Sequence, residues 1–131
     1  MTYATLKKAG LATLAALAIT ATLPAASAMA ADGPASEFVV KSTTDGRIKL
    51  GVKAFKKGKF EKSASYSRQA LKASLSRKKT AIAQSNLCAA YAKLEMMDEA
   101  QTACSAALDL RPDYAPAQAN KAALTIRLAQ K

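Results

Sequence analysis

The spacing of apolar residues after Asp45 constrains the fold more than any other feature of this 131-residue chain. Glycine occurs there only at positions 46, 51 and 58, and proline only at 112 and 116. Alanine is abundant, and apolar side chains recur at the period of an amphipathic helix. The pattern predicts an all-α fold. We expect helices over residues 46–57, 60–78, 80–94, 97–110 and 115–129.

Short links join these predicted helices. Gly58-Lys59 and Glu95-Met96 leave room only for tight turns, and residues 111–114 join the last two helices. Consecutive helices with such short links pack antiparallel. We therefore expect two antiparallel helical hairpins followed by a final helix.

The two hairpins align with each other at a constant offset of 37 residues. The aligned positions pair Leu50-Gly51 with Leu87-Cys88, Phe60 with Met97, and Ala70-Leu71 with Ala107-Leu108. Helix pairs that repeat at about 34 residues are typical of stacked helical arrays. We assign the three additional residues of the first hairpin to Arg77-Lys78-Lys79.

The second hairpin carries the positions of a known repeat motif. They are Leu87, Cys88, Tyr91, Ala100, Cys104, Ala107-Leu108 and Pro112. Residues 45–131 thereby resemble the tetratricopeptide repeat family, although the first hairpin lacks the terminal proline and has Ser63 where the family has alanine. The resemblance implies a short α-solenoid, with units at about 45–80 and 81–114 and a capping helix at 115–131.

The resemblance also implies a partner-binding inner face, formed mainly by the first helix of each unit. The candidate residues are Lys49, Val52, Phe55, Lys56, Ser85, Asn86, Ala89, Ala92, Lys93, Asn120 and Arg127. Asn86 and Asn120 correspond to each other, 34 residues apart. Some family members clamp a peptide carboxylate with asparagine and basic residues, but only part of that set is present here. The alternative is that these residues are ordinary helix surface.

The two cysteines lie one on each helix of the second hairpin. Cys88 and Cys104 are 16 residues apart, with the turn near residue 96 midway between them, so they lie at matching heights. If both face inward, their Cα atoms come within disulfide range. The alternative is that they are buried as two small apolar residues.

The first thirty residues have the order of a cleavable signal peptide. Lys7 and Lys8 precede the uncharged residues 9–23, and Ala28-Met29-Ala30 is a small-residue cleavage site. The apolar run is shorter than the ~20 residues that span a bilayer, so we expect no transmembrane anchor after cleavage. We expect the protein in the periplasm or secreted.

Residues 31–44 form a predicted flexible leader between the signal peptide and the helices. Glycine, proline and serine dominate its start, and no helical period runs through it. Within it, Phe38-Val39-Val40 is consistent with a short strand or an apolar tether.

Positive charge is concentrated in the first unit. Cleavage after residue 30 leaves a net charge of +9, and residues 41–80 hold 13 basic and two acidic residues. This surface is either a solvated face or a binding surface for an anionic partner: an acidic protein, a lipid head group or an envelope polymer. Nucleic acid is not expected, because an exported protein rarely meets it.

The sequence lacks the residues and motifs that most enzymes use for catalysis. It contains no histidine, which removes the usual general base and the commonest metal ligand. No zinc spacing, phosphate-binding loop or nucleophile motif occurs, so we expect no catalytic residue, metal or cofactor. The sequence favours an exported protein- or peptide-binding module. The alternatives are a cationic protein that binds anionic lipid or polymer, and a self-assembling structural subunit that forms a homo-oligomer.

Overall fold

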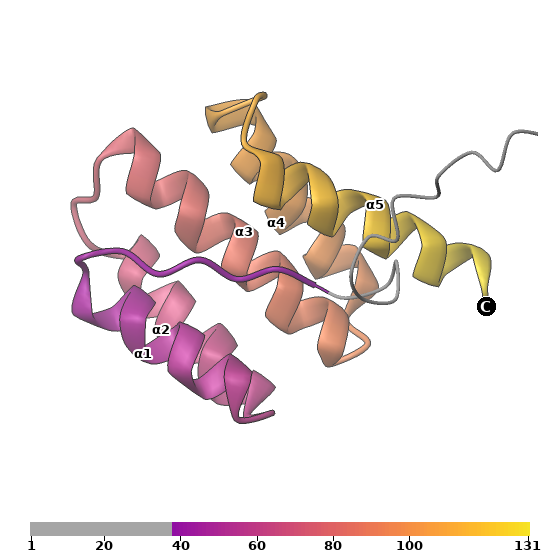
Figure 1. Cartoon of the computed structure of the whole chain (residues 1–131), viewed down its shortest axis with the longest axis horizontal. Coiled ribbons are helices and arrows are strands. Elements are labelled where there is room, and N and C mark those ends of the chain that lie inside the picture. The colour runs from indigo at the N-terminus through magenta and orange to yellow at the C-terminus, as the bar shows by residue number, and fades with distance from the viewer. Residues whose placement is uncertain (1–37) are drawn as a thin grey trace, which may run out of the picture. The chain divides into compact units, whose positions relative to one another are not determined.

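The computed structural model describes residues 38–131, so the predicted signal peptide and residues 31–37 of the leader lie outside the described residues. Within residues 38–131 the fold is all-helical, with no strand, which confirms the predicted class (Figure 1). The helices are α1 (Gly46–Lys56), α2 (Phe60–Leu71), α3 (Arg77–Lys93), α4 (Met97–Leu110) and α5 (Ala115–Ala129).

Local signals set the ends of the first hairpin and repeat in the second. The Asp45 carboxylate accepts hydrogen bonds from the backbone N–H groups of Arg47 and Ile48, which caps α1. Gly58 closes the α1–α2 turn with φ 71°, and Glu95 takes φ 61° in the α3–α4 turn, 37 residues later. The left-handed backbone suits glycine and is unusual for glutamate. The two turns therefore have the same backbone shape despite their different residues.

The boundary between the two hairpins differs from the prediction. α2 ends at Leu71 rather than at residue 78, and α3 already begins at Arg77. Ser76 Oγ accepts the backbone N–H of Lys79 at 3.4 Å and caps α3, which explains why α3 begins at Arg77 rather than at residue 80. At the 34-residue offset the first residue of α5, Ala115, corresponds to Ala81, so α3 begins four residues earlier than α5 does. The additional residues of the first unit therefore lie in the first turn of α3, which includes Arg77-Lys78-Lys79.

Each helix contacts the next helix along the chain, and α3 also contacts α1 and α5. Figure 1 shows α1, α3 and α5 on the near side of the structure, with α2 and α4 behind them. The three odd-numbered helices therefore share one side of the structure, called here the α1/α3/α5 face.

Small residues set the helix crossing in each hairpin. A Cβ at Gly51 would lie 3.4 Å from the Ser63 carbonyl oxygen and 3.5 Å from Ser67 Oγ, so α1 and α2 approach closely there. At the corresponding positions of the second hairpin, Cys88 and Cys104 are joined in a disulfide with their Cα atoms 5.2 Å apart. Both hairpins therefore cross at the same register.

Candidate functional site

The α1/α3/α5 face is occupied by the chain's own residues 38–41. Figure 1 shows the segment before α1 running across α3 toward α5. It is neither helix nor strand by backbone hydrogen bonding. The prediction of a flexible leader is therefore wrong for this part of residues 31–44, because the helices bind it through side chains.

Two asparagines hold the main chain of the segment. Asn86 Oδ1 accepts the Lys41 N–H at 2.8 Å, and Asn86 Nδ2 donates to the Lys41 carbonyl at 2.8 Å. Asn120 makes the same pair of bonds to Val39, at 2.7 and 2.8 Å. In an extended chain, residues two apart present their main-chain groups in the same direction. Equivalent asparagines on α3 and α5 therefore hydrogen-bond to the main chain of alternate residues of the segment.

Both asparagines are buried, with Asn86 2% and Asn120 0% exposed. Asn120 Nδ2 also lies 3.1 Å from both Ser85 O and Ser85 Oγ, which fixes the orientation of its amide. A buried amide without partners is costly. With residues 38–41 in place, the oxygen and the nitrogen of each amide have a partner, so the segment completes the polar groups of the face.

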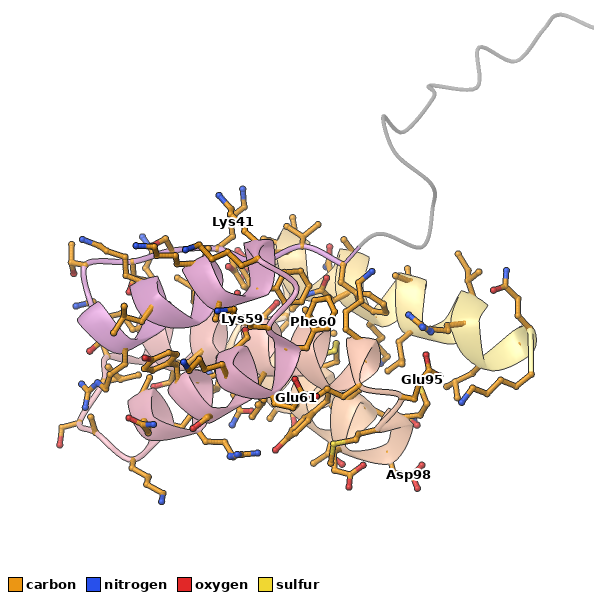
Figure 2. All side chains as sticks on the ribbon, turned by 90° about the horizontal axis from the view of Figure 1, so that it is seen from below. Lys41, Lys59, Phe60, Glu61, Glu95 and Asp98 are labelled. Atoms are coloured by element: carbon orange, nitrogen blue, oxygen red, sulfur yellow. A yellow bond between two sulfur atoms is a disulfide. The ribbon has the colours of Figure 1, made fainter. Side chains whose placement is uncertain are left out.

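The side chains of the segment alternate between the core and the solvent. Phe38 is 3% exposed and joins the apolar core, and Val40 packs partly against that core. The Lys93 ammonium lies 6.0 Å from the Phe38 ring centre and 5.9 Å from the Phe60 ring centre, within cation–π range. Figure 2 shows Lys41 pointing away from the helices. The face thus takes the apolar side chains of Phe38 and Val40, whereas Lys41 is exposed.

The structure brings only part of the predicted site together. Five predicted residues of α3 and α5 surround or support the segment by hydrogen bonds, cation–π contact or core packing. They are Ser85, Asn86, Ala89, Lys93 and Asn120. Ala92 is also fully buried in this core. Neither asparagine is ordinary helix surface.

The other predicted site residues do not hydrogen-bond to the segment. Lys49 and Lys56 are exposed on α1, whereas Val52 of the same helix is buried. Phe55 packs edge-on against Phe60, with their ring centres 5.2 Å apart, and against the core cluster that contains Phe38. These α1 residues therefore support the fold or face solvent.

Arg127 is bound to the α3–α4 turn. Its guanidinium donates to the Glu95 carboxylate, which also lies 3.1 Å from Lys131 Nζ. The hydrogen bond from Lys131 and the charge of Arg127 lower the pKa of Glu95. Arg127 thus links α5 to the preceding hairpin and is not free on the binding face.

The sequence predicts a short strand or an apolar tether at Phe38-Val39-Val40. The structure has no strand there and buries Phe38 in the core, which favours the tether. Sequence reasoning did not assign these residues to the binding face. The signal was the apolar run Phe38-Val39-Val40 inside a polar stretch. Nothing local indicates its docking site, because its partners Asn86 and Asn120 are 45 and 81 residues away along the chain.

Two further features of residues 38–131 concern other kinds of site. No group of three or more histidine, cysteine, aspartate or glutamate residues gathers there to hold a metal ion. None of the described helices is both long and apolar enough to cross a membrane.

The comparisons with known proteins find no match to this chain among family models, curated proteins or solved structures.

Proposed function

We propose that this chain is an exported, non-enzymatic protein of the tetratricopeptide type, whose α1/α3/α5 face binds an extended segment of a partner protein. The observation that carries the proposal is the paired hydrogen bonding of Asn86 and Asn120 to the main chain of Lys41 and Val39. The face already holds an extended peptide, which is the chain's own.

The helix arrangement supports the repeat interpretation. Successive helices contact each other in chain order, and α3 contacts both α1 and α5, as stacked hairpins require. The crossing residues Gly51 and Cys88 correspond, and so do the left-handed residues Gly58 and Glu95. Asn86 and Asn120 occupy equivalent positions of successive repeats. The spacing of the repeats therefore sets the distance between the two asparagines along a bound extended segment.

Main-chain recognition sets the kind of partner segment. The two side-chain amides can bind the main-chain N–H and carbonyl of any extended residue except proline, which has no N–H. Selectivity comes from the apolar sites that hold Phe38 and Val40. The favoured partner segment is extended, with apolar residues two positions apart and a polar residue next to them.

Residues 38–41 compete with any partner for this face. A tethered segment has an effective concentration of about a millimolar or more, so it masks the face from a free peptide of similar intrinsic affinity. A partner segment must bind more tightly than the chain's own segment or meet the protein when that segment has dissociated. The strength with which residues 38–41 bind the face therefore sets the affinity that a partner segment must exceed.

Export is supported by two separate features. Residues 1–30 have the charge, apolar run and small-residue site of a signal peptide. Cys88 and Cys104 form a disulfide, a bond that persists in oxidising compartments outside the cytoplasm.

A peptide-binding measurement tests the proposal. The probe is a fluorescent peptide with the sequence of residues 36–43, and the protein carries Phe38→Ser to weaken its own segment. We expect the peptide to bind this variant at least about tenfold more tightly than the unchanged protein, because a buried phenylalanine contributes more than 1.4 kcal/mol. Adding Asn86→Ala to Phe38→Ser should remove most of that binding.

The matched control is Lys57→Glu, an exposed change just after α1 that should leave binding by the Phe38→Ser protein unchanged. Equal peptide binding with and without Phe38→Ser, or binding indifferent to Asn86→Ala, would contradict the proposal.

The exposed lysines of α1 and of its C-cap favour a second candidate, binding of an anionic lipid or polymer. Lys49, Lys53, Lys56 and Lys57 are exposed, and none forms an ion pair within the part of the chain that the structure describes. Such attraction is screened over ~8 Å at physiological salt. Binding to anionic vesicles that is lost at high salt and with Lys53→Glu, but kept with Asn86→Ala, would favour this candidate.

A further inference from the structure

Lys93 lies beside the site that holds Phe38, and its ammonium contacts two aromatic rings. It is the last residue of α3. The ammonium lies 6.0 Å from the centre of the Phe38 ring and 5.9 Å from the centre of the ring of Phe60, the first residue of α2. Lys93 forms no ion pair with a carboxylate of residues 38–131. In the described part of the chain, the partners of this charge are therefore the two rings.

The contact with Phe60 positions the cation independently of residues 38–41. Phe60 packs edge-on against Phe55 of α1, with their ring centres 5.2 Å apart, so the fold of the first hairpin holds its ring. A side chain that is already held in place loses less conformational freedom when a ligand arrives. Lys93 is therefore prepared to meet the side chain that takes the place of Phe38.

The register of a bound segment determines which of its residues meets Lys93. Asn86 and Lys93 are seven residues apart, so they lie on the same side of α3, about 10 Å apart along its axis. Asn86 holds the main chain of Lys41, and Phe38 lies three residues before it, about 10 Å away in an extended chain. The two spacings match. A segment held by Asn86 therefore presents to Lys93 the side chain three residues before the one that Asn86 holds.

The apolar cluster around Phe38 favours a large, uncharged side chain at this position. Most of the other buried members of the cluster are alanine or cysteine, and Phe38 is 3% exposed. A smaller aliphatic side chain would leave part of the volume of the ring empty. A carboxylate would lose its hydration there. Burial therefore selects for size, and the neighbouring cation can select among side chains of similar size.

We infer that Lys93 determines the specificity of the α1/α3/α5 face by selecting partner segments that have an aromatic residue at the position of Phe38. The inference rests on the proposed function and deepens it. The face of an aromatic ring is electrically negative and attracts a cation, whereas a saturated ring of similar size does not. The favoured segment has an aromatic residue, a residue held by Asn120, an apolar residue and a residue held by Asn86, in that order.

The test compares two peptides on two proteins. Both peptides have the sequence of residues 36–43, and one has cyclohexylalanine, a saturated ring of similar size, in place of Phe38. Both proteins carry Phe38→Ser, and one also carries Lys93→Met, which keeps an unbranched side chain without the charge. We expect Lys93→Met to lower the preference for the aromatic peptide, measured as the ratio of the two affinities, by about two- to fivefold.

The matched control is Lys62→Met, which removes the same charge from an exposed position on α2 and should leave the ratio unchanged. A ratio that is equally unaffected by Lys93→Met would overturn the inference. So would a peptide with Phe38→Glu that binds as tightly as the unchanged peptide, because Lys93 would then select a carboxylate.

A failure of both peptides to bind would count against the proposed function, and the chain's own segment then decides the role of Lys93. Phe38→Leu should lower the equilibrium constant for folding about two- to fivefold less in the Lys93→Met protein than in the unchanged protein, since the ring no longer has its cation. Chemical denaturation of the two single variants and the double variant measures this coupling. Equal effects of Phe38→Leu in both proteins would overturn the inference.

Discussion

Asn120 is a buried residue whose side chain hydrogen-bonds to several groups at once. It bonds to the N–H and carbonyl of Val39 and to Ser85, and it is fully buried. Truncation leaves those main-chain groups without their partner, at about 1–3 kcal/mol for each buried group. The energetic weight of this one side chain is therefore larger than that of an exposed amide on the same helix.

The first prediction is that Asn120→Ala lowers the free energy of unfolding by about 2–3 kcal/mol, and Asn86→Ala by about 1–2 kcal/mol. Chemical denaturation followed by circular dichroism measures both. Gln118→Ala is the matched control: its amide donates to the Pro112 carbonyl at 2.8 Å from an exposed position, so its loss should cost less than about 0.5 kcal/mol. Equal effects for Asn120 and Gln118 would contradict the assignment.

Tyr114 gives a prediction of the opposite sign. Its side chain is 8% exposed, and its hydroxyl has no hydrogen-bond partner within residues 38–131. Burial also raises the pKa of the Tyr114 hydroxyl. Tyr114→Phe removes an unsatisfied polar atom and keeps the ring beside Arg111. We expect unchanged or slightly higher stability, by up to about 1 kcal/mol in thermal denaturation, and a clear loss would contradict this.

At the scale of the element, α1 depends on its cap. The hydrogen bond from the Arg47 side chain, with those from the backbone N–H groups of Ile48 and Arg47, lowers the pKa of Asp45 to about 2. A carboxyl with a depressed folded-state pKa stabilises the fold above its unfolded pKa of about 4, and this contribution is lost as the pH falls toward 2. α1 is therefore most sensitive to acid at its first turn.

The resulting prediction is a loss of stability between about pH 4 and pH 2 that involves Asp45. Asp45→Asn keeps a side-chain oxygen for the cap but removes the titrating group. Stability measured by denaturation at several pH values should therefore vary less with pH in this variant over that range. An unchanged pH profile in Asp45→Asn would show that other groups cause the acid loss.

The second hairpin depends on its disulfide. The bond closes a loop between Cys88 and Cys104, 16 residues apart in sequence. A loop of about 15 residues corresponds to a stabilisation of about 3 kcal/mol in the chain-entropy account. We expect reduction, or the double change Cys88→Ala and Cys104→Ala, to lower the free energy of unfolding by about that amount. Identical unfolding curves with and without reductant would contradict this.

The first hairpin crosses at Gly51 and Ser67 and lacks a cysteine pair, so it offers a control for this effect. Local unfolding of α1 and α2, followed by hydrogen exchange, should respond less to reductant than unfolding of α3 and α4.

At the scale of the whole molecule, local patterns indicate the helices but not the docking of the leader. α4 and α5 lie where the apolar period predicts them, at 97–110 and 115–129. The end of α2 was missed because Ala73 and Leu75 continue the apolar spacing beyond Leu71, while the N-cap Ser76 interrupts it. Asn86 and Asn120 were identified because repeats place equivalent residues at equal spacing.

Local sequence patterns could not predict that residues 38–41 occupy the α1/α3/α5 face. An extended segment has no internal period, and its bonds to Asn120 join residues 81 apart along the chain. Such pairing depends on the assembled helices, which position two amides at the spacing of alternate residues. The binding face therefore arises only from the stacking of units.

Amide hydrogen exchange of residues 38–44 tests the central claim most directly, namely that the α1/α3/α5 face binds an extended chain through two asparagines. The account predicts protection at the N–H groups of Val39 and Lys41, which donate to Asn120 and Asn86. Asn120→Ala should expose Val39 most, Asn86→Ala should expose Lys41 most, and excess peptide of residues 36–43 should speed exchange at both. Exchange at both positions as fast as in an unstructured peptide, in the unchanged protein, would contradict the account.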